Sequence, residues 1–568
     1  MDKFLKYVSM ACVALVMTSC VQDLNTVPID KNSTTGFNQD ALFTKIYATL
    51  GTTGQTGAAG ASDVDDIDEG VSGLFRVTWV LNGFPTDEGW WIWKDVGVDQ
   101  VREMAWDGEN ALVKCLYFRC MIDAKYCNHF LAMADSTTQK DLDQRAEVRF
   151  IRALNYWYLL DMYRYIPYME KESTDPNNYP VFYTRKQMYE WLEPELIDLT
   201  TKLPANRLGK YRVDQAAAWL LLARLYLNAG IYLELEESEW GPYMQKAITA
   251  SDKALGYGYA LHDVEPKIAK GDGTRFSAYQ QLFMGDNDKN GAQNEAVLLV
   301  YQDGKYCRSY GGVQYAIAAT RDGGMVPWGV STSWKCFRSS PEFVYKFVEK
   351  DKAGKIKANE YEMPIHPDVM DDRAILCSSV KKNANKWNLT GGKASDFYAS
   401  WACPKFTAVY STADSLKHAL NSDSEWPDTD IPLMRIAEAY MTKAEALYRT
   451  GDPTGALNII NNVIRKRAHA AALNALTPDI LCDEWCREFW GEGRRRIDLI
   501  RFNRFAGDIA NASGYTWEGR PGKADKIRNW YPVPSDDKRT NPNFKTQVID
   551  DPENEYANEG GDGYTFAD

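Results

Sequence analysis

A pair of amphipathic helical segments in the C-terminal part of the chain limits the folds that this sequence can adopt. The first segment spans Ile431–Thr450 and the second spans Asp452–Ala468. Apolar residues recur at helical spacing on one face of each segment, namely Ile436, Tyr440, Ala444 and Leu447, then Leu457, Ile460 and Ile464. Gly451 allows the chain to reverse, and Asp452 followed by Pro453 is a typical helix start. The sequence therefore predicts two antiparallel helices that pack on each other.

A second pair of the same kind lies earlier in the chain. Asp214–Gly230 is followed by a helical pattern over Tyr243–Leu255. Helices that stack in pairs around a glycine turn are typical of tetratricopeptide repeats. Further helices are predicted over 37–50, 110–134 and 141–163. These patterns predict a mainly α fold, with a tetratricopeptide-like scaffold of helical pairs and long loop-rich insertions.

The helical patterns divide the chain of 568 residues into regions. They fall in 37–260 and 431–510, which are predicted to form the scaffold. Residues 261–430 have poor helical periodicity and many Gly, Asn, Asp and aromatic residues. Loops on a rigid scaffold are where binding usually occurs, so this insertion is expected to contribute the binding site. Residues 511–568 are predicted to pack on the scaffold as a C-terminal segment.

The N-terminus has the features of an export signal. Lys3 and Lys6 precede a mostly apolar run, Tyr7–Met17, which is too short for a permanent transmembrane helix. A small residue and then Cys20 follow, as at a bacterial lipoprotein cleavage site. We expect residues 1–19 to be a lipoprotein signal peptide, Cys20 to be acylated and 20–36 to be a tether. The alternative is an ordinary secretory signal with a chance cysteine.

Charge and cysteine spacing exclude several classes of ligand. The net charge of -13 disfavours nucleic acid, which needs clustered Lys and Arg. There is no CxxC among the cysteines and no HExxH among the five histidines, so zinc is not expected. Buried structural thiols are the better interpretation of the cysteines.

Two polar motifs have a structural interpretation as well as a functional one. Asp286, Asp288 and Asn290 precede Gly291 like the start of a calcium-binding EF-hand loop, but the expected acidic residue comes too early, at Glu295. A polar turn is preferred and a structural calcium ion is the alternative; no cofactor is required. The arginine-rich run 491–501 is interleaved with acids, which favours an ion-pair network over a nucleic-acid site.

Aromatic residues form the strongest functional signal. They make up 13% of the chain, and Trp90, Trp91 and Trp93 lie within the single segment 86–95. Further Tyr and Trp residues lie in the 261–430 insertion. An aromatic ring can stack on the apolar face of a sugar while polar side chains bind the hydroxyl groups. Glycan binding is therefore one hypothesis.

Two other functions stay open at this point. The chain has no GxSxG, P-loop or dinucleotide motif, but a carboxylate pair of a glycoside hydrolase is defined by its spatial separation and has no sequence signature. A glycoside hydrolase on a helical scaffold is the main alternative. An adaptor that binds protein segments is the other, although the export signal and the aromatic loops speak against it.

Three stretches resemble the SusD/RagB family of outer-membrane lipoproteins of Bacteroidota. They are Arg145–Pro167, Glu484–Phe505 and Tyr531–Phe544. Residues 26–50 and 285–293 are similar to the starch-binding member of that family. The resemblance implies a non-catalytic lipoprotein, anchored in the outer membrane and exposed at the cell surface. It also implies that the protein captures oligosaccharides and passes them to a SusC-like TonB-dependent transporter, alongside other surface glycan-binding lipoproteins.

The same resemblance implies a site for an α-glucan such as starch. An arc of aromatic rings corresponds to Trp93, Tyr310 and Trp334, with Arg76 close by, and Trp91 shares a face with Trp93 if the segment is extended. Trp90 would then point into the core. Trp90 and Trp91 are bulkier than the family pattern, and Val96 stands where a polar neighbour is expected. A different glycan, such as dextran or a fructan, is therefore the alternative ligand.

Overall fold

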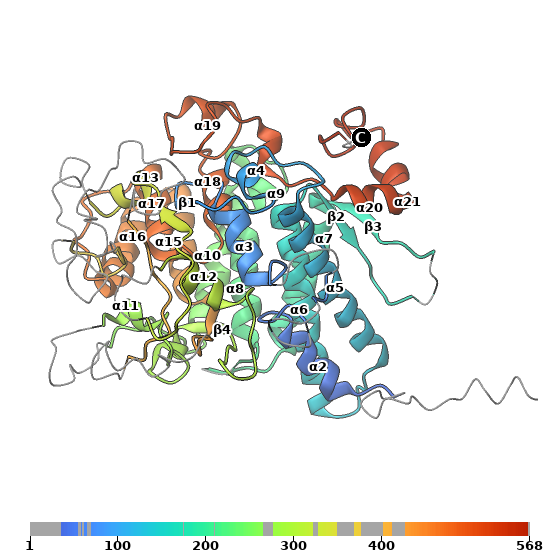
Figure 1. Cartoon of the computed structure of the whole chain (residues 1–568), viewed down its shortest axis with the longest axis horizontal. Helices are drawn as coiled ribbons and strands as arrows, with labels where there is room; N and C mark the ends of the chain where they lie inside the picture. The colour runs from blue at the N-terminus through green and yellow to red at the C-terminus, as the bar shows by residue number, and fades with distance from the viewer. Residues whose placement is uncertain are drawn as a thin grey trace, which may run out of the picture.

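The computed structural model is built mainly from α-helices, as the sequence predicts (Figure 1). It describes residues 36–565 except 55–57, 59–61, 65–69, 174, 176, 209–210, 265–275, 322–327, 349–368, 377–400 and 412–425. The predicted signal peptide and Cys20 lie outside the described residues, as does the predicted tether except Gly36. Across the described residues, no helix has both the length and the apolar character that crossing a membrane requires.

The longer helices carry most of the scaffold. They are α2 (Gln39–Ala48), α3 (Leu74–Gly83), α5 (Ala111–Met133), α6 (Gln139–Met162), α7 (Arg185–Lys202), α8 (Gln215–Leu227), α10 (Gly241–Leu255), α15 (Ala437–Arg449), α16 (Pro453–Ile459), α17 (Pro478–Phe489) and α18 (Arg495–Arg501). A π-helical turn, Ile460–Arg465, continues α16.

Shorter elements connect and cover these helices. The helices are α4 (Val98–Arg102), α9 (Ala229–Tyr232), α11 (Ala278–Gln281), α12 (Val313–Ala319), α13 (Pro341–Tyr345), α19 (Asp508–Ala512), α20 (Ser535–Thr540) and α21 (Pro542–Phe544). The strands are β1 (Gly89–Trp91), β2 (Tyr165–Tyr168), β3 (Val181–Thr184), β4 (Ala296–Val300), β5 (Phe337–Ser339) and β6 (Ile431–Arg435). They form three antiparallel two-stranded sheets, β1–β5, β2–β3 and β4–β6.

Side-chain caps define where the scaffold helices begin. Asn110 accepts hydrogen bonds from the first backbone N–H groups of α5, and Asp214 does the same for α8. Thr138 and Asp141 form a reciprocal capping box at the start of α6. Asp452 caps α16 and is followed by Pro453, the arrangement predicted from the sequence. These local signals explain why the helix starts are close to the predicted ones.

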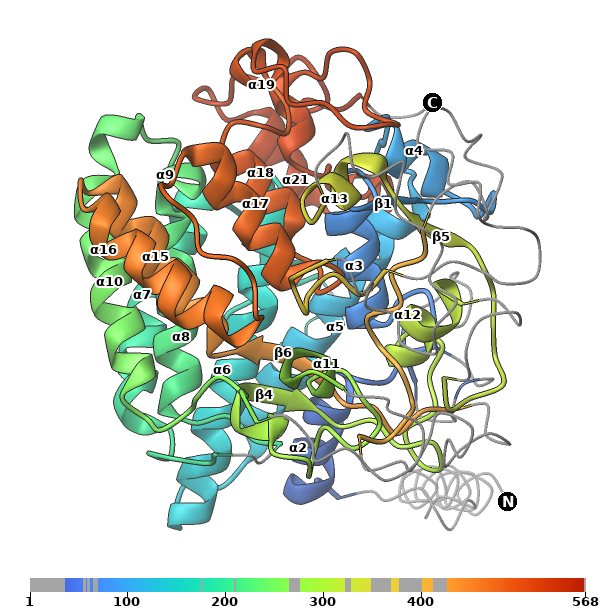
Figure 2. The ribbon, with the colours of Figure 1, turned by 90° about the vertical axis from the view of Figure 1, so that its left-hand side faces the viewer.

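The helices pack against one another in series. Contacts join α5 to α6, α6 to α7, α7 to α8, α8 to α10, α10 to α15, and α15 to α16. In Figure 2 the helices α7, α8, α10, α15 and α16 gather at one side, while α3, α12, β1 and β5 lie toward the opposite side. The helical pairs therefore form one side of the molecule, and α12 and β5 of the insertion lie away from them.

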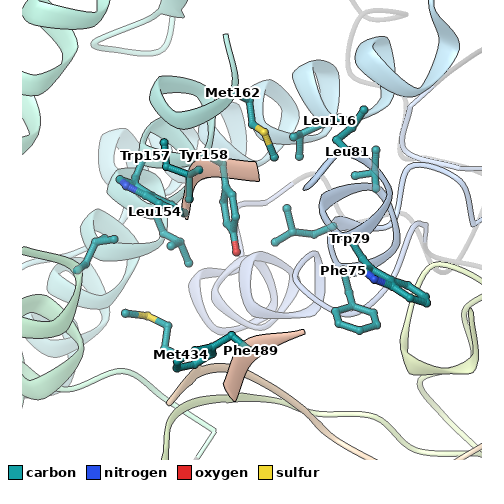
Figure 3. Close-up of a cluster of buried hydrophobic side chains, with 14 of the residues drawn as sticks. Phe75, Trp79, Leu81, Leu116, Leu154, Trp157, Tyr158, Met162, Met434 and Phe489 are labelled. Carbon is teal, nitrogen blue, oxygen red and sulfur yellow. The ribbon is translucent and has the colours of Figure 1, made fainter. Parts of the chain in front are cut away.

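One apolar core joins segments that are far apart in the sequence. Phe75 and Trp79 of α3 converge with Tyr158 of α6, Met434 of β6 and Phe489 of α17 (Figure 3). All five side chains are buried. Because α3 contributes to this core, its N-terminal end is held firmly beside Gly311 of the insertion.

The predicted helix over 431–450 is wrong in its first turns. Ile431–Arg435 is strand β6, which pairs with β4 from the insertion, and the helix begins only at Ala437. Strand pairing with a distant segment overrides the helical periodicity of these residues. Residues 89–91 form β1, so the tryptophan-rich segment 86–95 is extended at its centre.

Seven cysteines of the described residues are buried: Cys115, Cys120, Cys127, Cys336, Cys403, Cys482 and Cys486. Burial raises the pKa of the thiols of Cys127, Cys403 and Cys482, which keeps them protonated. The interpretation of these cysteines as buried structural thiols is confirmed.

Candidate functional site

The β1–β5 sheet brings two distant tryptophans to the same end of a pair of strands. Gly89 pairs with Ser339 and Trp91 pairs with Phe337 in an antiparallel register. Trp93 follows the end of β1, and Trp334 precedes the start of β5. Because neighbouring antiparallel strands run in opposite directions, the end of one lies beside the start of the other. A Cβ atom on Gly89 would lie 2.1 Å from the carbonyl oxygen of Arg338, so this close pairing requires glycine.

Helix α12 fixes the backbone of the second tryptophan. The N–H of Trp334 donates to the carbonyl of Ala318 at 2.7 Å, and the N–H of Cys336 donates to the carbonyl of Ala319 at 3.0 Å. Lys335 between them has a φ of 46°, a left-handed conformation that a non-glycine residue rarely adopts. The Trp334 segment is thus held against the end of α12, which also carries Tyr315.

Six aromatic rings contact one another in sequence, and we call them the aromatic cluster: Trp93, Trp91, Tyr315, Trp334, Tyr310 and Trp426. Trp93 meets the edge of Trp91 at a centroid distance of 6.2 Å, and Trp91 stacks on Tyr315 at 5.3 Å with 15° between the planes. Tyr315 lies 6.1 Å from Trp334. Trp334 lies 6.0 Å from Tyr310, and Tyr310 lies 4.7 Å from Trp426.

Exposure divides the aromatic cluster into two groups. Trp93 is 43% exposed, and Trp334 and Tyr310 are half-buried. Trp91 and Tyr315 are each 2% exposed. The first group can offer ring surface to a ligand, while the second group supports it from below.

Arg76 lies beside the aromatic cluster because Gly73 and Gly311 have no side chains to keep their backbones apart. A Cβ atom on Gly73, before α3, would lie 2.4 Å from the Cα of Gly311. This contact allows the N–H of Arg76 to donate to the carbonyl of Gly311 at 3.2 Å. The Arg76 guanidinium then lies 4.3 Å from the centre of the Tyr315 ring, a cation–π distance. A half-buried arginine at this place can donate hydrogen bonds to hydroxyl groups of a ligand.

The structure therefore brings together all five residues predicted for the glycan site: Trp93, Tyr310, Trp334, Arg76 and Trp91. Their contact with a glycan stays a prediction, and the burial of Trp91 leaves it little surface for that purpose. The indole N–H of Trp91 donates instead to Asp95 at 2.8 Å. Trp90 is 4% exposed, which confirms its predicted place in the core.

Two members of the aromatic cluster were not predicted from the sequence as site residues. Tyr315 follows Tyr310 by five positions and lies on α12. Its position in the aromatic insertion is a signal, but one shared with many other residues. Trp426 is also in the insertion, and no pattern in its neighbourhood distinguishes it from a core tryptophan. Both are identified only by their ring contacts.

The predicted calcium ligands are engaged in other interactions. The two carboxylate oxygens of Asp286 accept hydrogen bonds from the backbone N–H and the hydroxyl of Ser411, at 2.9 and 2.7 Å. The amide oxygen of Asn290 accepts from the N–H of Ala292 at 2.9 Å. These hydrogen bonds are those of a polar turn, the preferred interpretation of the segment 286–290. A structural calcium ion at this segment stays an untested prediction.

The arginine-rich run is confirmed as an ion-pair network. Arg495 makes a bidentate pair with Asp87, with both N···O distances at 2.7 Å. Arg496 pairs with Asp161 at 2.9 Å, and Arg501 pairs with Glu445 at 2.7 Å. All three arginines are buried, so they are inaccessible to a nucleic-acid backbone.

A separate cavity of about 390 Å³ shares no residue with the aromatic cluster. It lies between β2, α7, α9 and the segment 551–555. Two of its basic residues pair with acids, Arg164 with Glu555 and Arg185 with Glu234, and Lys186 lines the cavity as well. Because acidic and basic side chains are mixed in the lining, the cavity does not favour a strongly charged ligand.

Comparison with known proteins assigns the chain to a family. A model described as the SusD family matches residues 327–559. The starch-binding protein SusD of Bacteroides thetaiotaomicron is 34% identical to this chain over 580 residues, which cover 95% of this chain and 98% of that protein.

Solved structures agree at the level of the fold. A SusD superfamily protein from Parabacteroides distasonis has a TM-score of 0.62 at 16% identity and covers 89% of this chain and 97% of its own. A laminarin-binding SusD-like protein has a TM-score of 0.60 at 16% identity, with 87% and 95% covered. The relative that is 34% identical and matches nearly the whole length of both chains shows that this chain belongs to the SusD family.

Proposed function

We propose that this protein is a non-catalytic glycan-binding lipoprotein of the cell surface and that the aromatic cluster is its binding site. The observation that carries the proposal is the meeting of Trp93, Trp334, Tyr310 and Arg76, which come from four separate segments. Partly exposed rings next to an arginine match the chemistry of a sugar, which has apolar ring faces and many hydroxyl groups.

An α-glucan such as starch is the proposed ligand. The full-length relative at 34% identity is named for binding starch, which supports this class of glycan. The affinity is expected to be modest, because stacking adds on the order of 1 kcal/mol per ring. A modest affinity allows the bound chain to leave again, as delivery to a SusC-like TonB-dependent transporter requires. Dextran and fructans are the alternative ligands.

Retention in a starch affinity gel tests the site. We expect Trp93→Ala and Trp334→Ala each to abolish retention, since each removes a ring with accessible surface. Tyr179→Ala is a matched control, because Tyr179 is 37% exposed and no contact joins it to the aromatic cluster among the described residues. Thermal unfolding of every variant separates loss of binding from loss of fold. Undiminished retention of both tryptophan variants would contradict the site.

The absence of catalysis and the choice of glycan are tested with the same purified protein. We expect no release of reducing ends when the protein is incubated with starch, dextran, pullulan or a fructan. Calorimetric titration with the same four glycans is expected to give heat of binding with starch and pullulan, which contain α-1,4 linkages. Binding to the fructan alone would replace the α-glucan proposal, and binding to dextran alone, an α-1,6-linked glucan, would replace starch as the ligand. Either result would keep the site.

A further inference from the structure

A second group of exposed aromatic rings lies on the turn 301–306, which we call the tyrosine turn. Tyr306 is 73% exposed and Tyr301 is 43% exposed. Among the described residues, only three other aromatic side chains are comparably exposed: Phe37, Trp93 and Tyr179. Two exposed rings on one short turn leave a concentrated apolar area in water, and such areas often mark binding sites.

Hydrogen bonds hold the tyrosine turn in a defined shape. One carboxylate oxygen of Asp303 accepts from the backbone N–H groups of Lys305 and Tyr306, at 2.6 and 2.7 Å. The other oxygen accepts from the hydroxyl of Tyr301 at 2.9 Å. The N–H of Gly304 also donates to Asp428 at 2.9 Å. The turn is therefore ordered before any ligand binds, which lowers the entropic cost of binding.

The ring of Tyr301 is supported from one side. The ring of Tyr211 meets it at a centroid distance of 5.2 Å and 79° between the planes. The hydroxyl of Tyr211 in turn donates to the buried Asp430 at 2.9 Å. The Nζ atom of Lys305 lies 4.8 Å from the centre of the Tyr306 ring and covers one of its faces. The high exposure of Tyr306 leaves other ring surface free.

The tyrosine turn directly adjoins the aromatic cluster. A Cβ atom on Gly304 would lie 2.5 Å from the carbonyl oxygen of Trp426, so the two backbones touch there. The Trp426 ring contacts Tyr310 at 4.7 Å. Tyr306 is two residues beyond Gly304, so its Cα atom lies within about 7 Å of the Cα atom of Gly304.

We propose that the tyrosine turn is an additional subsite for oligosaccharides that extend beyond the aromatic cluster. Tyr306 would stack on a sugar ring of the extension, with Tyr301 as a second contact. The exposed ammonium group of Lys305 can donate hydrogen bonds to its hydroxyl groups, while Asp303 holds the turn in shape. The inference rests on the proposed glycan-binding function, and it adds that the site favours long chains over short ones.

Calorimetric titration with maltotriose and maltodecaose tests this subsite. We expect Tyr306→Ala to lower the affinity for maltodecaose about fivefold, as loss of one stacked ring implies, and to leave the affinity for maltotriose unchanged. Tyr179→Ala is the control for a generic exposed tyrosine and is expected to change neither affinity. Because Tyr306 is mostly exposed, its removal is not expected to unfold the protein.

The outcomes separate this inference from the proposed function. If the unmodified protein binds both sugars and Tyr306→Ala changes neither affinity, the subsite is wrong and the glycan-binding function stands. If Tyr306→Ala lowers both affinities equally, Tyr306 belongs to the central site and the chain-length argument is wrong. If the unmodified protein binds neither sugar, both the α-glucan proposal and the subsite for it are wrong.

Discussion

Trp91 and Trp93 are two positions apart and lie in opposite environments. Trp91 stacks between Phe84 and Tyr315, at centroid distances of 5.4 and 5.3 Å, and its indole N–H is bound to Asp95. Trp93 keeps 43% of its surface exposed and contacts the cluster only through the edge of Trp91 among the ring pairs described. The same residue type therefore serves packing at one position and a surface role at the other.

This difference predicts that replacing Trp91 destabilises the protein much more than replacing Trp93. Trp91→Ala is expected to lower the free energy of unfolding by about 3–5 kcal/mol, because it removes a buried tryptophan from a packed stack. Trp93→Ala is expected to lower it by less than about 1 kcal/mol, because much of this side chain is already in water. Denaturant unfolding of the two variants measures both values. Equal destabilisation by the two changes would contradict the division of the cluster into supporting and accessible rings.

At the scale of elements, two adjacent carboxyl groups anchor the start of β1 to the C-terminal helices. Asp87 pairs with Arg495 of α18 and with Lys346, and these cations hold its pKa far below the usual range of an aspartate. Glu88 is 3% exposed and accepts from the N–H of Gly491 at 3.3 Å. Burial raises the pKa of Glu88 to about 8, although Arg495 opposes this effect.

The raised pKa of Glu88 predicts a pH-dependent stability. Between the ordinary pKa of about 4.5 and the folded pKa of about 8, the folded state binds more protons than the unfolded state. Stability contributed by this group is therefore present at low pH and lost as the pH rises through 8. Glu88→Gln is expected to match the unmodified protein near pH 5 and to exceed its free energy of unfolding by several kcal/mol near pH 9. Denaturant unfolding at the two pH values checks this.

Asp87→Asn is the matched change at the neighbouring carboxyl group, and it is expected to lower the stability of the protein. It removes the fully buried carboxylate that pairs with Arg495 and Lys346, and leaves them with the more exposed Asp483. The free energy of unfolding is expected to fall by about 3–5 kcal/mol at both pH values, as for a broken buried ion pair. If Glu88→Gln instead destabilises the protein near pH 9, the fold favours the ionised carboxylate and the raised pKa of Glu88 is wrong.

The elements also show what the sequence can predict. The predicted helices over 110–134 and 141–163 agree closely with α5 and α6, because Asn110 and Thr138 supply local caps. The start of the 431–450 segment was mispredicted because its strand is created by pairing with β4, more than a hundred residues away in sequence. Local signals predict elements that are stabilised locally, and they miss those that depend on a distant partner.

At the scale of the whole molecule, the candidate site is a product of tertiary structure. Trp93, Tyr310 and Trp334 were placed together by family resemblance, since no spacing in the chain relates them. The structure supplies the physical reason: β1 pairs with β5, and Gly73 touches Gly311. Tyr315, Trp426 and the tyrosine turn were not predicted as site residues because their role depends on which rings lie side by side. The residue types indicate the chemistry of the site, but only the fold shows which of these residues lie together.

At the same scale, the N-terminal sequence predicts how the molecule is held at the membrane. Because the apolar run Tyr7–Met17 and Cys20 resemble a lipoprotein signal, we propose that acyl chains on Cys20 provide the anchor. Metabolic labelling with palmitate in a bacterial host is expected to label the unmodified protein and not the Cys20→Ala variant, which should also leave the membrane fraction. Cys12→Ala is the matched control, because Cys12 lies within the predicted signal peptide and its loss should change neither result.

Binding and anchoring should be separable in the same experiment. The described fold begins at residue 36, and every residue of the aromatic cluster lies beyond that point. Purified Cys20→Ala protein is therefore expected to be retained in a starch gel as strongly as the unmodified protein. If Cys20→Ala is still labelled and still sediments with membranes, the anchor is elsewhere and the lipoprotein assignment is wrong. If it is released but loses retention in starch, the N-terminal segment contributes to the site, contrary to a binding surface built entirely from the folded scaffold and its insertion.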